Sequence, residues 1–103
     1  MSDPYNRAPS EPSGADSFNR APGGTASAVL AYLARHIVDE PDAVGVETSG
    51  GGGGQPMRLL LQVAPGDVGR VIGRRGRTAQ AIRAVTRAAA ARDGEEVFVD
   101  IAD

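Results

Sequence analysis

The chain has 103 residues, no cysteine and a formal net charge of −2 at pH 7. This length predicts one domain, and the absence of cysteine excludes disulfide frameworks, thiolate metal sites and cysteine nucleophiles. The small net charge conceals an asymmetry: eight arginines and one acidic residue lie between Arg58 and Arg92, a net charge of +7, whereas residues 1–57 carry −4 and residues 93–103 carry −5. Such a basic segment is typical of a surface that binds a polyanion.

No apolar stretch has the length of a signal-peptide core or of a membrane span, which takes about 20 apolar residues. We therefore expect a soluble cytoplasmic protein. Residues 1–24 are rich in Pro, Ser, Gly, Asp and Asn and almost lack aliphatic side chains, which predicts a disordered tail followed by a domain at 25–103.

The tail contains a short repeat, YNRAP at 5–9 and FNRAP at 18–22. One interpretation is a duplicated linear motif that docks a partner through its aromatic side chain and arginine. The other is a duplication without function, which we favour because short motifs often match by chance.

The first predicted helix begins near Thr25 or Ser27, since either hydroxyl can cap the opening turn, and it ends before Pro41. Its apolar side chains form one stripe at helical spacing: Ala26, Val29, Leu30, Leu33 and Ile37. His36 lies off this stripe and no second candidate ligand is nearby, so we interpret it as a surface residue rather than a metal ligand.

Two strands are predicted next, at 44–49 and at 57–64, joined by five glycines and a glutamine that predict a flexible connection. In the second strand Met57, Leu59, Leu61 and Val63 face one way, because side chains alternate along a strand. A short helix at 68–72 follows Pro65-Gly66-Asp67.

A long helix begins after Gly76 and ends at Asp93-Gly94, and its predicted buried face consists of Thr78, Ile82, Val85 and Ala89. The last strand is predicted at 96–101. The resulting order, α–β–β–α–α–β, predicts an α+β fold in which three helices cover one face of a three-stranded sheet.

The segment GRVIGRRGRTAQAIR at 69–83 concentrates glycine and arginine. A phosphate-binding P-loop requires a lysine after its last glycine and a strand in front, but the chain contains no lysine and a helix leads into the segment; the Rossmann glycine spacing fails too. A plain turn explains the glycines but not Arg74, Arg75 and Arg77, because cations are disfavoured at a helix N-terminus. A bound anion resolves the conflict, since amides at a helix start and arginines both bind phosphate.

This segment and its context resemble the GXXG signature of type II KH domains. More narrowly, residues 59–90 are similar to the KhpA family of small bacterial RNA-binding proteins, which consist of little more than one KH domain. The resemblance covers about residues 26–103. It implies that Gly73, Arg74, Arg75 and Gly76 clamp the backbone of about four single-stranded nucleotides.

The resemblance further implies that bases rest on Val71 and Ile72, with Ile82 and strand residues such as Leu60 completing the groove. General KH domains carry a large aliphatic residue where this chain has Ala79, which implies a shallow groove floor. The tail and the five glycines have no counterpart in the family pattern.

Beyond the loop, Gln80, Arg83 and Arg87 share one face of the long helix and extend the positive surface; for the two arginines, a merely solvated helix face is the alternative. Arg77 is open to two interpretations, an RNA contact or a residue that caps the turn or faces water. None of the four aromatic residues lies near the loop in the sequence, so we expect backbone clamping with low sequence selectivity and no stacking platform.

The leading hypothesis is a non-enzymatic protein that binds single-stranded RNA and acts as a chaperone or post-transcriptional regulator, without cofactor, metal or small-molecule substrate. The resemblance implies a homodimer, or a heterodimer with a KhpB-type KH partner. The alternative is a protein-interaction adaptor that makes no RNA contact. An enzyme is disfavoured because no catalytic carboxylate pair, metal-ligand cluster or nucleophile–base pair lies near the loop.

Overall fold

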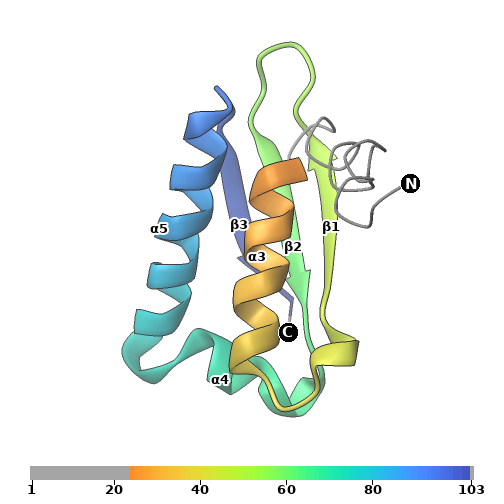
Figure 1. The fold of residues 1–103 in the computed structure, drawn as a ribbon, viewed down its shortest axis with the longest axis vertical. Helices are drawn as coiled ribbons and strands as arrows, with labels where there is room; N and C mark the ends of the chain where they lie inside the picture. The colour runs from red at the N-terminus through yellow and green to blue at the C-terminus, as the bar shows by residue number, and fades with distance from the viewer. Residues whose placement is uncertain (1–23, 103) are drawn as a thin grey trace, which may run out of the picture.

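A computed structural model describes residues 24–102 of the chain (Figure 1). Its helices and strands follow the predicted order: α3 (Gly24–Ile37), β1 (Gly45–Gly50), β2 (Met57–Gln62), α4 (Val68–Ile72), α5 (Arg77–Arg92) and β3 (Val97–Ile101). Short 3₁₀ turns occupy Pro41–Ala43, Pro65–Asp67 and Arg74–Gly76. The α+β fold is therefore confirmed, whereas residues 1–23 of the predicted tail, with the repeat at 5–9 and 18–22, lie outside the described residues.

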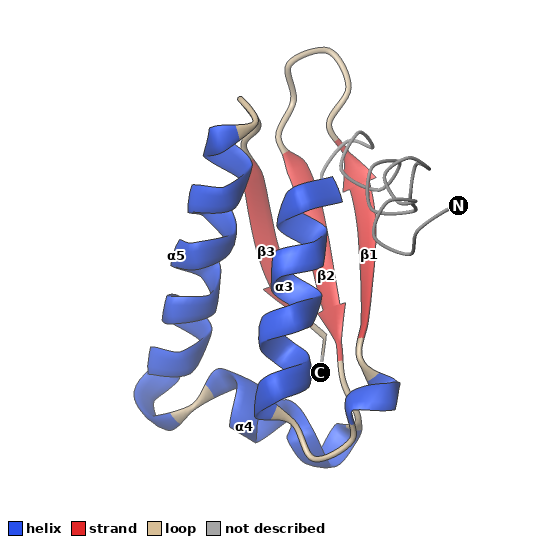
Figure 2. Cartoon of the chain, viewed as in Figure 1, coloured by secondary structure: helices blue, strands red, loops and turns tan. Residues whose placement is uncertain are grey.

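The three strands form one mixed sheet with β2 in the centre (Figure 2). β1 pairs with β2 antiparallel and β3 pairs with β2 parallel. Both α3 and α5 lie over the same face of this sheet, and α4 lies at the end where β2 leaves it (Figure 1). The other face of the sheet has no helix over it among the described residues.

The core lies between the sheet and the two long helices. Strand residues alternate as predicted, since Met57, Leu59 and Leu61 are buried whereas Arg58 is exposed. The core cluster also includes residues of α3 and the position after it, of α4, of α5 and of β3: Ala26, Leu30, Ala34, Val38, Val71, Ile82, Ala90, Val97 and Val99.

The buried face of α5 differs from the predicted one. The buried residues are Ala79, Ile82, Thr86 and Ala90, whereas Val85 is 48% exposed. Alanines occur on every face of this helix, so its apolar pattern did not distinguish two neighbouring faces. The buried face of α3 differs less from its prediction, since Leu30 is buried as expected. Ala34 is buried where Leu33 was expected, and Leu33 is half-buried.

The polar end of α3 agrees with its prediction as surface. His36 is exposed, its Nδ1 lies 2.8 Å from the backbone oxygen of Tyr32, and the two rings lie 4.3 Å apart. Among the described residues, no helix combines the length and apolar character needed to cross a bilayer.

Candidate nucleic-acid interface

The glycine segment forms a tight connection between α4 and α5 in which three residues have positive φ angles. Gly73 ends α4 with φ 77° and ψ 173°, Arg75 has φ 57° and ψ 25°, and Gly76 has φ 74° and ψ 10°. The backbone N–H of Gly73 donates to the Gly69 oxygen at 2.9 Å, and that of Gly76 donates to the Gly73 oxygen at 3.1 Å. These bonds hold the loop in one compact turn.

The two glycines are needed for different reasons. A Cβ on Gly73 would lie 2.9 Å from the backbone nitrogen of Thr78 and closer still to the Thr78 side chain, so no side chain fits there. A Cβ on Gly76 would meet nothing within 4 Å, so only its left-handed backbone favours glycine. Arg75 adopts the left-handed region without being glycine, a strained conformation of the kind that clusters at functional sites.

The loop arginines are exposed and unpaired. Arg74, Arg75 and Arg77 are all exposed, and none of their side chains forms a hydrogen bond or ion pair with another residue of the described range 24–102. Three free guanidinium groups on one turn repel one another and create a strongly positive site. An anion that bridges them would relieve this repulsion, which is the chemistry expected of a phosphate contact.

Two predicted base-contacting residues lie in the core instead. Val71 is 0% exposed and Ile82 is 3% exposed, so neither offers a surface to a base in this structure. Both side chains belong to the core cluster that also contains residues of α3 and the sheet. Ile72 is 37% exposed and keeps an accessible apolar surface beside Gly73.

The predicted groove residues divide between two surfaces. Gln80 is exposed on α5, and Arg83, one turn further along, donates from Nε to the Val99 backbone oxygen of β3 at 3.0 Å. Leu60 pairs with Glu47 and Asp100 on the sheet face that turns away from the helices. Leu60 therefore lies on the opposite face of the sheet from the buried Leu59 and Leu61.

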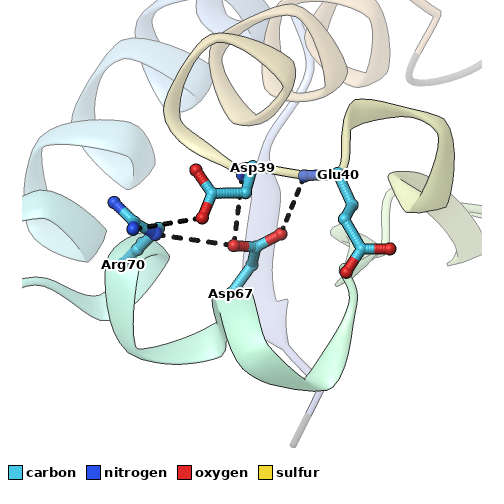
Figure 3. A network of polar contacts seen from close by, with 4 residues as sticks. All are labelled: Asp39, Glu40, Asp67 and Arg70. Atoms are coloured by element: carbon cyan, nitrogen blue, oxygen red, sulfur yellow. Dashed lines mark hydrogen bonds and ion pairs between the residues drawn. The ribbon is translucent and has the colours of Figure 1, made fainter.

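A carboxylate outside the predicted site, Asp67, joins the segment just after α3 to the start of α4 (Figure 3). Asp67 is 2% exposed, and its Oδ1 and Oδ2 accept the backbone N–H groups of Asp39 and Glu40, each at 3.1 Å. Arg70 lies 3.1 Å from Asp39 and 3.6 Å from Asp67. We name these four residues, Asp39, Glu40, Asp67 and Arg70, the Asp67 clasp. The one available signal was that Asp67 is the single acid in the basic segment.

Some of the arginines are held in ion pairs, whereas others are free to contact a ligand. Arg70 is engaged in the Asp67 clasp, and Arg58 lies 2.7 Å from Asp100. The positive charge free to meet a ligand therefore concentrates on the loop and on the exposed side of α5. In the described part of the chain no group of three His, Cys, Asp or Glu side chains could hold a metal ion.

A model of the KH domain of KhpA/KhpB matches residues 27–101, which include every helix and strand described above apart from the first turn of α3. The chain is 46% identical over 69 residues to a protein of Caldanaerobacter subterraneus named RNA-binding protein KhpA, an alignment that covers 67% of this chain and 89% of that one. It is 47% identical over 73 residues to the protein of the same name from Clostridium acetobutylicum, covering 71% and 95%. The Leifsonia xyli protein of that name is 45% identical over 74 residues, covering 72% and 92%.

Among solved structures, the chain is similar to a crystal structure of a point variant of Aquifex aeolicus Era bound to GDP.AlF4−, with a TM-score of 0.55 and 16% sequence identity. The match covers 74% of this chain and 29% of that one. At this identity the likeness concerns the fold alone.

Proposed function

Because the chain belongs to the KhpA/KhpB KH-domain family, we propose that it binds single-stranded RNA at the Gly73–Gly76 loop. The observation that carries the proposal is the exposed turn with three unpaired arginines and a glycine at which no side chain fits. The names of its relatives, RNA-binding protein KhpA, agree with it.

The loop geometry suits a sugar–phosphate backbone better than a base. Gly76 has open space where a side chain would lie, so a nucleotide strand approaches the start of α5 closely. Arg74 and Arg75 then supply charge-assisted hydrogen bonds to consecutive phosphates. Arg77 and Gln80 extend the contact along the exposed side of α5, and the apolar surface of Ile72 supports the first base.

Such a site takes unpaired RNA. The bases of a duplex are stacked and paired inside the helix, whereas a single strand offers its bases to a groove beside the loop. A clamp on the backbone reads little sequence, which fits a chaperone or a post-transcriptional regulator in the cytoplasm. No catalytic step is part of the proposal.

A four-nucleotide contact binds weakly, so joining two sites strengthens it. We propose that the chain acts as a homodimer or as a heterodimer with a KhpB-type KH partner; the shared family description of KhpA and KhpB agrees with such pairing. Analytical ultracentrifugation of the chain alone and mixed with such a partner tests this, and a monomer under both conditions would refute it.

The decisive experiment compares two double variants by fluorescence anisotropy with a labelled single-stranded RNA. Arg74→Gln/Arg75→Gln is expected to reduce the affinity at least tenfold, since two charge-assisted contacts are lost. Arg35→Gln/Arg92→Gln removes the same charge from exposed positions outside the loop and is expected to change the affinity less than about threefold. Circular dichroism confirms that both variants fold. Equal affinities of the loop variant and the wild type would refute the proposal and favour a protein-interaction adaptor.

A further inference from the structure

A polar hollow of about 440 Å³ lies at the free edge of β3. The residues that line it are Arg58, Arg83, Arg87, Phe98, Val99 and Asp100. We name it the β3-edge cleft. It brings together three arginines, one acid and one aromatic residue that lie up to 42 positions apart in the sequence.

The walls of the cleft come from opposite sides of the sheet. Arg83 and Arg87 belong to α5, on the face of the sheet that the helices cover. The Arg83 Nε–H donates a hydrogen bond to the Val99 backbone oxygen at the edge of β3. Phe98 pairs with Arg58 across β2 and β3, and both lie on the face that no described helix covers. The cleft therefore leads from the helical side, over the edge of β3, onto the open face.

Phe98 is the group in this cleft that calls for an explanation. Its side chain is 47% exposed, which is unusual for a phenylalanine in a strand. The Arg58 guanidinium carbon lies 5.9 Å from the ring centroid, at the outer limit of a cation–π contact. Nearly half of the Phe98 side chain is nevertheless open to solvent.

We propose that single-stranded RNA leaving the glycine loop runs along α5, crosses the edge of β3 and stacks one base on Phe98. Arg87, which is exposed on α5, flanks the nucleotide and neutralises its phosphate, while Arg58 stays paired with Asp100. This inference rests on the proposed function and extends it, because it adds an aromatic stacking site outside the four nucleotides held by the loop. Base–aromatic stacking tolerates any base, in keeping with a clamp of low selectivity.

Charge and position favour RNA as the occupant over a second copy of the chain. Three arginines against Asp100 make the cleft positive, which suits phosphates and repels a second, equally positive surface. Arg87 lies ten residues beyond Arg77 on α5, roughly 15 Å along the axis, so the cleft continues the positive face that begins at the loop.

The neighbouring hollow sets the far limit of the path. It is lined by Arg87 and Phe98 but also by Glu95 and Glu96, whose carboxylates repel phosphate. A strand that reaches Phe98 therefore ends there or turns away onto the open face. The bound RNA is accordingly longer than the four nucleotides at the loop, but it does not extend past Phe98 toward Glu95 and Glu96.

The test is a length series of labelled oligouridines of four, six, eight and ten nucleotides, with binding measured by fluorescence anisotropy. The wild type is expected to gain about 5- to 100-fold in affinity between four and eight nucleotides, the gain of one stacked base. Phe98→Leu is expected to lose this gain and to keep the affinity for the four-nucleotide RNA. Phe98→Tyr, which keeps an aromatic ring, is expected to restore it.

Tyr32→Leu is the matched control, because Tyr32 is 62% exposed on α3, outside the β3-edge cleft. This variant is expected to bind oligouridine of every length with the affinity of the wild type. Oligouridine carrying 5-iodouracil provides a direct reading, since irradiation joins it to a stacked ring, and mass spectrometry should find the crosslink on Phe98. Circular dichroism establishes that each variant is folded.

The outcomes separate this inference from the proposed function. If the wild type and Phe98→Leu show the same length dependence while Arg74→Gln/Arg75→Gln loses binding, the stacking site is refuted and the loop site stands. If Phe98→Leu dissociates an oligomer and the length dependence changes only with that dissociation, a second copy covers Phe98 and the inference is wrong. If the wild type binds no RNA of any length, both proposals are refuted.

Discussion

Gly73 and Gly76 look equivalent in the sequence but occupy different backbone regions. Gly73 has φ 77° and ψ 173°, a region that is essentially restricted to glycine, and a side chain there would overlap Thr78. Gly76 has an ordinary left-handed conformation with open space around it. The turn therefore requires glycine at position 73, because any side chain would overlap Thr78. At position 76 glycine only avoids the strain of a left-handed backbone.

This difference predicts unequal effects of two identical substitutions. Gly73→Ala is expected to lower the free energy of unfolding by about 3 kcal/mol or to displace the loop, because overlap and backbone strain act together. Gly76→Ala is expected to cost about 1 kcal/mol, the strain of the left-handed region alone. Urea denaturation measures both. Equal costs for the two variants would contradict the assignment.

Thr86 is a polar residue on the buried face of α5. It is 0% exposed, and its Oγ1 has no hydrogen-bond partner among the described residues. A buried hydroxyl without a partner is destabilising, because folding removes its bonds to water and returns none. Val85, its neighbour in the chain, was predicted to be buried but is exposed.

Thr86→Val is therefore expected to raise the free energy of unfolding by about 1 kcal/mol, since valine keeps the shape and removes the hydroxyl. Thr86→Ser keeps the hydroxyl and removes a methyl group, and is expected to lower it by about 1 kcal/mol. Urea denaturation of the two variants gives the sign of each effect. A valine variant less stable than the serine variant would show that the hydroxyl has a partner.

At the scale of elements, the Asp67 clasp connects two helices that the chain separates by a complete hairpin. Asp67 accepts backbone N–H groups at the end of α3, and α4 begins at the next residue, Val68. Since the glycine loop follows α4 directly, the clasp fixes the position from which the loop starts. Charged acceptors of backbone hydrogen bonds are also among the stronger contributors to stability.

Asp67→Asn is expected to lower the free energy of unfolding by about 2 kcal/mol, because an amide provides one acceptor oxygen where the carboxylate provides two. Asp39→Asn removes only the exposed ion pair with Arg70, and a cost below about 1 kcal/mol is expected. Thermal and urea denaturation test this pair. A larger cost for Asp39→Asn would show that the ion pair, and not the backbone contact, joins the helices.

Secondary structure followed from local patterns, whereas the buried helix faces did not. The alternation in MRLLLQ and the Pro and Gly residues that end each segment placed all six elements within a few residues of their observed bounds. Alanine-rich α5 carries apolar side chains all round, so the choice between neighbouring faces depends on how closely α3 and the sheet approach it.

At the scale of the whole molecule, folding distributes the arginines into two groups. Arg58 and Arg70 are ion-paired, whereas the loop arginines are exposed without a partner among the described residues. A chain of net charge −2 thus carries a cluster of unpaired positive side chains at the loop. This asymmetry favours an ionic-strength-dependent association with a polyanion.

The RNA affinity is accordingly expected to fall with salt, with a slope near −2 in a plot of log affinity against log salt concentration for about three phosphate contacts on a single strand. Arg74→Gln is expected to reduce the magnitude of the slope by about 0.7. Anisotropy titrations over a series of salt concentrations measure both values. A slope near zero would indicate that the loop binds no phosphate.

The sequence alone determined the order of the elements, the glycine loop and its arginines, and the family to which they point. These features depend on the conformational preferences of individual residues and on short spacings, which are local properties of the chain. Only the tertiary structure decided which side chains those elements conceal and which they bring together. Val71 and Ile82 became core residues, and Phe98 came to lie beside arginines of α5 and β2, because burial and proximity depend on the packing of segments that are distant in the chain.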